Sequence, residues 1–311
     1  MSVAQHTSST RRSMLTLALG VAVIGLQDPI IKGLMDGYPL AEAIVIRSIA
    51  ALPIFAILLW RLGFVTSLRA GSQRVFVARG VVLMLAYTTY FLSFPAMPLA
   101  NVIALYFTAP LFVVALSRPV LHEQQGAGRW AAVLVGLVGA IVVAHPTGAG
   151  IGWSALLPVV AAAMYAFGQI IARRWGGPSN ATVMSFHQNS VYLVGASAFA
   201  LIAAPLATTG AGTGPVDFLL RAWVMPDLRD LLLLALCGPI AVAGTILLTK
   251  AYREAPPGAV TVLEYTLLIW ATFWGYVVFG EVPGAWTIVG ASLIIASGAY
   301  AMTRAAPVAS A

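Results

Sequence analysis

Four of the ionisable side chains within long apolar stretches of the sequence are candidates for function: Asp28, Lys32, Arg47 and Glu264. A charged group in an apolar span is energetically costly, so each is a candidate for binding a substrate, an ion or a proton. Acidic and basic groups together would suit a solute that carries both charges. The first chemistry to consider is therefore solute binding within a membrane.

Asp28, Lys32 and Arg47 can be paired in more than one way. Asp28 precedes Pro29, which lacks a backbone N–H and predicts a kink in the first helix. Lys32 follows Asp28 by one helical turn, so the two can neutralise each other. Asp28 and Arg47 also lie about seven residues, roughly 10 Å, from the same end of their helices, which permits an ion pair. Two interpretations stay open: Arg47 or Asp28 binds one end of a zwitterionic substrate, or the pair only locks two helices together.

Glu264 stands beside Tyr265 and shares a helical face with Thr261 and Leu268, at spacings of three and four residues. In a partly hydrated cavity its carboxylate would bind a substrate ammonium group or carry a coupling proton. The alternative is a solvated carboxylate near the membrane interface.

Aromatic residues with polar neighbours recur in several apolar stretches. Aromatic walls with a few polar tips suit amphipathic solutes, including amino acids with large side chains, although helix packing is the alternative for any single ring. Asn101 is as well suited to capping a helix as to binding a ligand. We predict a substrate cavity lined by Tyr87, Tyr90, Asn101, Tyr106, Thr108, Tyr165, Gln169, Gln188, Glu264, Tyr265 and Trp270.

A polar cluster, Ser185 to Ser190, interrupts a later apolar stretch. Ser185, Gln188 and Asn189 share one helical face, whereas His187 points roughly opposite. So polar a face is not expected to contact lipid. It either lines the cavity or joins helices by hydrogen bonds.

Ten apolar stretches must position these residues. They cover residues 14–35, 40–60, 79–97, 100–117, 129–145, 152–172, 181–205, 231–252, 257–279 and 284–303. Each is about long enough to cross a hydrocarbon core of roughly 30 Å. Thirteen of the 17 Lys and Arg residues fall in connectors on one side, three (Lys32, Arg221 and Arg229) fall on the other, and Arg47 lies inside a stretch. Because excess positive charge marks the cytoplasmic face, we expect ten membrane helices with both termini in the cytoplasm.

The composition excludes most other classes. Sixty per cent of the residues are hydrophobic and 9% are charged, which is not typical of a water-soluble domain. The net charge of +7 is spread over helix ends, so it indicates membrane topology and not nucleic-acid binding. The single cysteine, Cys237, lies in an apolar stretch and excludes an intrachain disulfide. No ATP-binding loop, zinc motif or nucleophile–base set is visible, so we expect neither an enzyme nor a bound metal or cofactor.

Two long segments of the chain repeat one pattern. Residues 94–144 and 252–301 each contain a proline turn, an apolar helix with an early tyrosine, an acidic turn and a helix opened by tryptophan. Tyr106 and Tyr265 are 159 residues apart, and Glu123 and Glu281 are 158 apart. Five stretches per half would give the halves opposite orientations, which is typical of secondary transporters with a site between the halves. We expect a leader over 1–13, repeats over 14–145 and 146–304, and a tail over 305–311, with leader and tail disordered.

These segments resemble a known family. The runs LSFPAMPLANVIALYFTAPLFVVALSRPVLHEQ and AYREAPPGAVTVLEYTLLIWATFWGYVVFGEVPGAWTIVGASLIIASG are similar to the EamA domain of the drug/metabolite transporter superfamily, and AIVIRSIAALPIFAILL resembles its second helix. The resemblance implies an all-α integral membrane protein with ten helices in two inverted five-helix repeats. Within the superfamily the chain is most similar to bacterial aromatic amino acid exporters of the YddG type, and Tyr106 and Thr108 match cavity positions. Ile269 departs from the pattern, because it replaces the proline that stands at Pro110 in the first half.

The sequence therefore predicts a carrier of the bacterial inner membrane that exports neutral or aromatic amino acids and related metabolites by alternating access. We expect a monomer or weak homodimer in the lipid bilayer, with no nucleic-acid partner. The alternatives are a carrier of another metabolite (a sugar, nucleotide sugar, purine or drug), or a lipid scrambler or lipid-modifying membrane enzyme.

Overall fold

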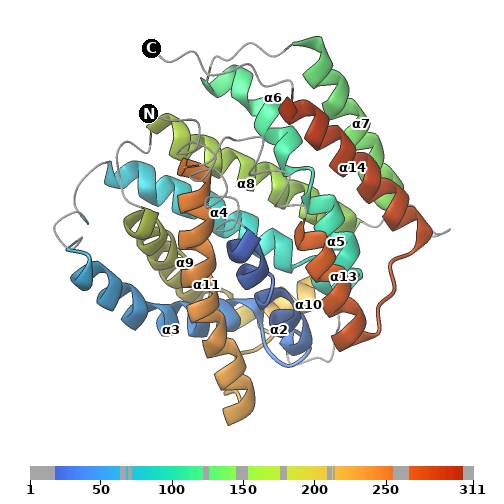
Figure 1. Ribbon diagram of the computed structural model, residues 1–311. Helices are drawn as coiled ribbons and strands as arrows, with labels where there is room; N and C mark the ends of the chain where they lie inside the picture. The colour runs from blue at the N-terminus through green and yellow to red at the C-terminus, as the bar shows by residue number, and fades with distance from the viewer. Residues whose placement is uncertain are drawn as a thin grey trace.

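The structure, a computed structural model, describes residues 18–63, 68, 72–121, 126–144, 153–175, 181–208, 212, 214–254 and 266–303. The predicted leader, the tail and the boundary between the predicted repeats lie outside these residues. In the described part the regular elements are helices, with one isolated bridge between Thr208 and Arg221. The helices form an elongated bundle, with α10 and α2 at one end and α6 at the other (Figure 1).

The helix bounds follow the apolar stretches of the sequence closely. The main helices are α2 Gln27–Leu34, α3 Leu40–Arg61, α4 Gln73–Phe91, α5 Leu99–Tyr106, α6 Ala109–Leu121, α7 Ala127–Val143, α8 Leu156–Trp175, α9 Ala181–Ala203, α10 Pro215–Leu220, α11 Leu228–Glu254, α13 Thr266–Phe279 and α14 Ala285–Thr303. Short 3-10 turns cover Phe94–Ala96, Trp153–Ala155 and Ala204–Leu206.

Six helical segments of the described chain are long and apolar enough to cross a membrane. They are Leu40–Arg61, Gln73–Ala96, Leu99–Leu116, Trp153–Ala172, Ala181–Leu206 and Leu228–Leu248. Three shorter apolar helices cover Trp130–Val143, Thr266–Phe279 and Ala285–Tyr300. The all-α membrane architecture agrees with the sequence, while ten crossings and the side of the termini stay predictions.

Two proline residues break apolar stretches that a simple hydropathy reading joins. Gly25 and Leu26 form a turn before α2, four residues ahead of Pro29. Phe107 and Thr108 form a turn between α5 and α6, just before Pro110. A proline ring clashes with the carbonyl four residues earlier, so each break falls where the helix would otherwise be strained. At the second break the Thr108 hydroxyl donates to the Leu105 carbonyl at 2.8 Å.

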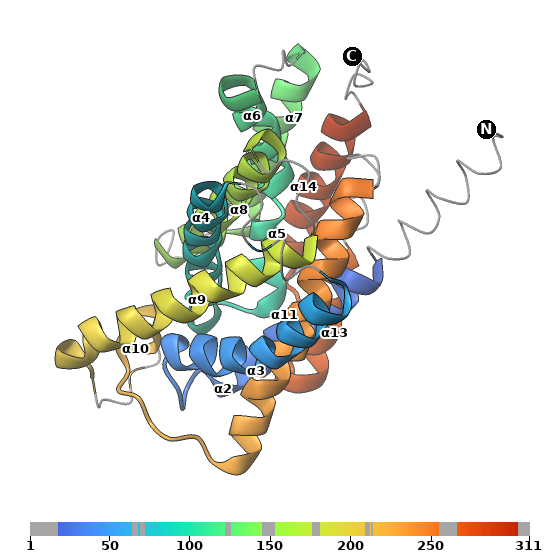
Figure 2. The same ribbon diagram turned by 90° about the vertical axis from the view of Figure 1, so that its left-hand side faces the viewer.

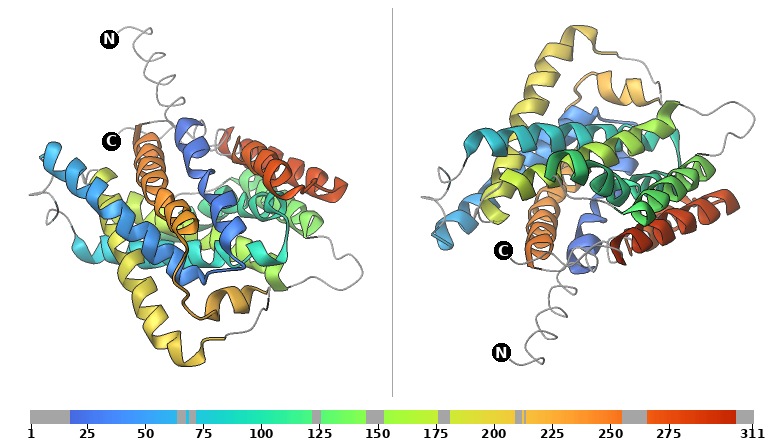
Figure 3. Two further views of the ribbon diagram at one scale, coloured as in Figure 1. Left: turned by 90° about the horizontal axis from the view of Figure 1, so that it is seen from below. Right: turned by 90° about the horizontal axis from the view of Figure 1, so that it is seen from above.

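Helices at corresponding places in the two predicted repeats pack in antiparallel pairs. On α7 and α14, Gly128 lies by Tyr300, whereas Gly139 lies by Gly290, so the numbering runs in opposite directions. Figure 3 shows these two helices side by side along one edge of the bundle. On α3 and α9, the Asn189 amide donates to the Ser48 carbonyl and Phe55 packs on Phe186, again in opposite directions.

The segment between α9 and α11 is tied to the beginning of α3. It contains the short helix α10. The Arg221 guanidinium donates to the Met35 carbonyl at 2.5 Å, and the Val224 N–H donates to the Glu42 carboxylate at 3.3 Å. The Tyr38 hydroxyl donates to Asp230 at 2.8 Å. Figure 2 shows α10 and α3 at the same end of the molecule.

Candidate functional site

A cavity of about 190 Å³ lies between helices of both halves. Its polar lining residues are Gln27 and Asp28 on α2, Arg47 on α3, Arg79 on α4, Gln169 on α8, Gln188 on α9 and Thr245 on α11. Its aromatic lining residues are Tyr87, Tyr90, Phe91, Tyr106, Phe107, Tyr165 and Tyr192. A cavity of ~150 Å³ can hold a benzene molecule, so this one has room for a single aromatic ring with a short substituent.

Aromatic rings form a continuous wall of the cavity. Tyr90 of α4 lies 5.0 Å from Tyr106, between ring centroids, and Tyr106 lies 5.6 Å from Tyr165. Tyr87 lies 5.4 Å from Tyr192 of α9. Tilted rings at these separations attract one another, which helps to hold the wall together. It offers both ring faces and ring edges to an aromatic solute.

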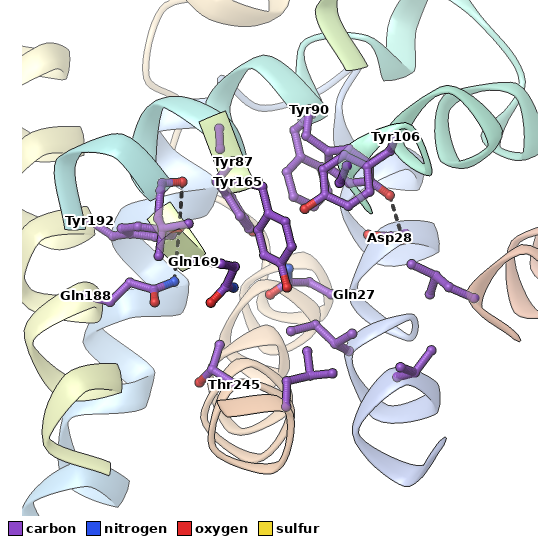
Figure 4. A pocket seen from close by; sticks show the side chains of 18 of the residues that line it. Gln27, Asp28, Tyr87, Tyr90, Tyr106, Tyr165, Gln169, Gln188, Tyr192 and Thr245 are labelled. Carbon is purple, nitrogen blue, oxygen red and sulfur yellow. Dashed lines mark hydrogen bonds between the residues drawn. The ribbon is translucent and has the colours of Figure 1, made fainter. Parts of the chain in front are cut away.

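An acidic group lies at one side of the cavity. The Asp28 side chain is 6% exposed, and its carboxylate accepts a hydrogen bond from the Tyr90 hydroxyl at 3.0 Å. The break at Gly25 and Leu26 turns the chain just before Asp28. Figure 4 shows this pair on the side of the cavity away from Gln188 and Tyr192.

Two guanidinium groups contribute to the lining. Arg47 donates to the Gln27 side-chain oxygen at 3.3 Å, and its guanidinium lies over the rings of Tyr87 and Tyr192, 4.6 and 5.2 Å from their centroids. Arg79 donates to the Gln188 side-chain oxygen at 3.2 Å. The Gln188 amide in turn donates to the Tyr192 hydroxyl at 3.1 Å. Acidic and basic groups thus share one aromatic-walled space.

The structure brings most of the residues singled out from the sequence to this cavity. Lining it are Asp28, Arg47, Tyr87, Tyr90, Tyr106, Tyr165, Gln169 and Gln188. Glu264 and Tyr265 lie outside the described residues. Lys32, Asn101, Thr108 and Trp270 are not among the lining residues, which differs from the prediction for the last three.

Helix packing accounts for these three differences. The Asn101 side-chain oxygen accepts a hydrogen bond from Thr287 of α14 at 2.8 Å, so it joins two helices. Thr108 is fully buried and bonds the backbone at the α5–α6 break. Trp270 is 37% exposed and packs edge-on against Phe273, so its ring lies at the surface of α13.

Asp28 and Lys32 have other partners than those considered from the sequence. Asp28 bonds Tyr90, and neither Lys32 nor Arg47 is within ion-pair distance of it. Lys32 instead pairs with Glu281, 2.5 Å between Nζ and Oε1. Lys32 is four residues from Asp28 but reaches a partner 249 residues away, because tertiary packing brings Glu281 closer than the helical neighbour.

Arg79 and Gln27 are cavity residues that the sequence analysis missed. Arg79 is the first residue of the stretch predicted at 79–97, so the sequence groups it with the connector charges. The helix in fact begins at Gln73, so Arg79 lies one and a half turns inside α4 and is only 5% exposed. The signal was present in Val75, Phe76 and Val77, apolar residues that precede Arg79 in the sequence.

The polar cluster of α9 serves both purposes considered for it. Gln188 lines the cavity, whereas Asn189 donates to the Ser48 carbonyl at 3.1 Å and joins α9 to α3. The His187 ring lies 2.8 Å from the Gln73 side-chain oxygen on α4. Within the described ranges, no group of three or more His, Cys, Asp or Glu side chains could hold a metal ion.

Comparisons with known proteins show that this chain is similar to transporters. Residues 11–144 match the model of the EamA-like transporter family. A riboflavin transporter of Vibrio cholerae is 27% identical over 308 residues, covering 96% of this chain and 95% of the relative. A pseudopaline exporter of Pseudomonas aeruginosa is 26% identical over 286 residues, covering 92% and 94%.

The fold is also found in a solved protein. A crystal structure with 18% sequence identity superposes with a TM-score of 0.59, over 95% of this chain and 96% of that chain. At this identity the similarity concerns the fold alone. The apolar helices and these relatives indicate a multi-pass membrane protein that carries a small metabolite, and the first half of the chain matches the EamA-like transporter family.

Proposed function

We propose that this chain is a secondary carrier of the bacterial inner membrane that exports neutral or aromatic amino acids and related small metabolites. The observation that carries the proposal is the cavity, in which a carboxylate and two guanidinium groups face one aromatic-walled space. An amino acid with a ring side chain has the complementary groups: an ammonium, a carboxylate and an aromatic face. The cavity volume of about 190 Å³ suits one such ring.

The packing supports transport by alternating access. Two pairs of corresponding helices, α3 with α9 and α7 with α14, run antiparallel, as expected for inverted halves around a central site. The cavity lining reaches Val21 before α2, Thr245 and Leu248 on α11, and Leu267 on α13. Leu247 lies against Gly20, so these lining residues share one end of the bundle. At the other end, Lys32 and Glu281 join the halves.

The ten-crossing topology with two inverted five-helix repeats and cytoplasmic termini belongs to this proposal. So do the monomeric or weakly dimeric state and the absence of a cofactor. If transport needs only solute and bilayer, the purified chain in liposomes is sufficient for flux. That makes reconstitution the decisive experiment.

The test is an uptake panel in proteoliposomes. Labelled phenylalanine, tryptophan, leucine and glutamate are compared with riboflavin, with and without a pH gradient. We expect saturable uptake of the neutral and aromatic amino acids, which protein-free liposomes do not show. Riboflavin uptake without any amino acid uptake would overturn the substrate assignment, while keeping the carrier.

A second candidate function is transport of another aromatic metabolite. The relatives named as riboflavin transporter and pseudopaline exporter support this breadth, and so does the wall of tyrosines. The same panel separates the candidates. To accept a larger ring system as well, the cavity would have to widen. Uptake of both the amino acids and riboflavin would reveal such widening.

A further inference from the structure

Two arginine side chains of the cavity are buried without a carboxylate partner in the part of the chain that the structure describes. Arg47 is 4% exposed and Arg79 is 5% exposed. The Nε atoms of both are buried and donate to no acceptor among the described residues. The ion pair found among those residues, between Lys32 and Glu281, lies outside the cavity lining.

The hydrogen bonds of these two groups fall far short of their capacity. A guanidinium has five N–H donors. Arg47 and Arg79 each make one side-chain hydrogen bond, to a neutral glutamine. The rings of Tyr87 and Tyr192 add cation–π attraction for Arg47. Neither an amide nor a ring supplies the negative charge that offsets the desolvation of a buried cation.

The two arginines converge although they come from different helices. Arg47 of α3 lies over the ring of Tyr192, and the Gln188 amide that accepts from Arg79 donates to the hydroxyl of that same Tyr192. The Tyr192 hydroxyl also donates to the Leu83 carbonyl at 2.8 Å, which fixes a ring that Arg47 contacts directly and that Arg79 reaches through Gln188. Asp28 accepts its hydrogen bond from Tyr90 and forms no ion pair with either arginine.

We propose that Arg47 and Arg79 form an anion subsite, and that the carried solute has a carboxylate or another oxyanion attached to an apolar or aromatic body. This proposal rests on the carrier function above and sharpens its substrate class. Arginine suits such a site because its planar donors match the two oxygens of a carboxylate. The aromatic wall then holds the body of the solute while the guanidinium groups hold its acidic end.

The test uses probes that share a benzyl body and differ in their charged groups. The unfolding midpoint of the full-length protein in detergent is followed against 3-phenylpropionate, L-phenylalanine, L-phenylalaninamide and 2-phenylethylamine. We expect the two carboxylates to stabilise the protein, and the amide and amine to bind about tenfold more weakly or worse, as the loss of a charge-assisted hydrogen bond predicts. Competition by inorganic phosphate identifies the source: displacement of 3-phenylpropionate assigns a general oxyanion site, and no displacement a carboxylate site.

Variants then assign the preference to the arginines. Arg79→Gln and Arg47→Gln should remove the preference for carboxylates, and Arg79→Lys should retain part of it, because charge remains without the planar donor geometry. Arg174→Gln, at an exposed position near the end of α8, is the matched control and should behave as wild type.

Equal stabilisation by all four probes in the wild type would overturn the proposal, whether or not any variant folds. The two proposals also fail separately. Carboxylate-selective binding without amino acid flux would sink the amino acid assignment alone. Amino acid flux that the amide inhibits as well as phenylalanine does would sink the subsite alone.

Discussion

Lys32 of α2 and Glu281, just after α13, form an ion pair that links the first half of the chain to the second. Each partner also binds the backbone before or at the start of α5: Lys32 donates to the Met97 carbonyl at 3.2 Å, and Glu281 accepts from the Leu99 N–H at 2.9 Å. Gly280 ends α13 in the left-handed conformation, φ 67°, which turns the chain so that Glu281 reaches back. Three segments therefore meet at one largely buried charge pair.

Breaking the Lys32–Glu281 pair should favour the conformation in which the cavity is open at the end of the bundle where this pair lies. Glu281→Gln leaves the Lys32 ammonium without its counter-charge, and such a loss is worth more than a tenfold shift in a two-state equilibrium. The measurement is labelling of Tyr90→Cys in a Cys237→Ser background, with an impermeant thiol reagent supplied at this end. We expect labelling to be faster in Glu281→Gln by about tenfold or more.

The matched control for that labelling experiment is Asp36→Asn. Asp36 is an exposed carboxylate at the same end of the bundle. Its removal changes the local charge by the same amount without touching the ion pair. Equal rates in the two variants would show that the Lys32–Glu281 pair does not hold this end closed.

Asp28 should select for solutes that carry an ammonium group. Asp28→Asn keeps an oxygen that accepts from Tyr90 and removes the negative charge. Under the proposed function, phenylalanine uptake should fall by about tenfold or more, from the loss of one charge-assisted interaction, whereas binding of 3-phenylpropionate should change little. Tyr90→Phe, which removes the hydrogen bond and keeps the carboxylate, is the control with the smaller expected effect. Undiminished uptake by Asp28→Asn would argue against this role.

The contact between α7 and α14 should not tolerate a side chain at Gly290. A Cβ atom built there would lie 2.6 Å from the Gly139 carbonyl oxygen, a backbone atom that cannot turn aside. Gly290→Ala should therefore cost about 1–3 kcal/mol, the usual range for overpacking. The midpoint of thermal unfolding in detergent measures it. Gly126→Ala, with no atom within 4 Å of the added Cβ, serves as control, and an equal loss in both would refute the packing explanation.

The hydrogen bond from Tyr38 to Asp230 predicts a dependence on pH. The Asp230 carboxylate, by accepting this bond, raises the pKa of Tyr38 above its ordinary value. Because the pKa is higher in the folded protein, the stabilisation is complete below the unfolded value of about 10 and is lost as the pH rises through the folded value. Tyr38→Phe should thus lower the unfolding midpoint at pH 8, and the gap from wild type should close above about pH 10.

Tyr276→Phe gives the baseline for that measurement. Tyr276 is an exposed tyrosine of α13, at 64% exposure, so the loss of its hydroxyl should matter little at either pH. A gap between Tyr38→Phe and wild type that stays constant to pH 11 would contradict the explanation.

Helix positions were largely predictable because each follows a run of apolar residues between polar ends. The stretch predicted at 40–60 appears as α3, Leu40–Arg61, and the stretch at 181–205 as α9, Ala181–Ala203. The errors occur where helices extend beyond the apolar run. The first two residues of α4, Gln73 and Arg74, are polar and Arg79 is charged, so hydropathy placed the start of that helix too late.

Side-chain partners were less predictable than helices. Spacing within a helix suggested that Asp28 would pair with Lys32, but the ammonium turns to Glu281 on a distant segment. The aromatic cavity residues were easier to predict, because rings with polar neighbours suit an amphipathic solute. Tyr87, Tyr90 and Tyr106 all line the cavity. Asn101 and Trp270 show the limit: their residue types suit a cavity, and only three-dimensional packing places them elsewhere.

The break at Phe107 and Thr108 divides one apolar stretch into two helices with different sets of neighbours. Before the break, α5 packs on α13, α8 and α14, whereas after it α6 packs mainly on α8. A rod in that position would couple the movements of α13 and α8 rigidly. With the break, a change in the angle between α5 and α6 would displace Tyr106, the last residue of α5, and with it one part of the cavity wall.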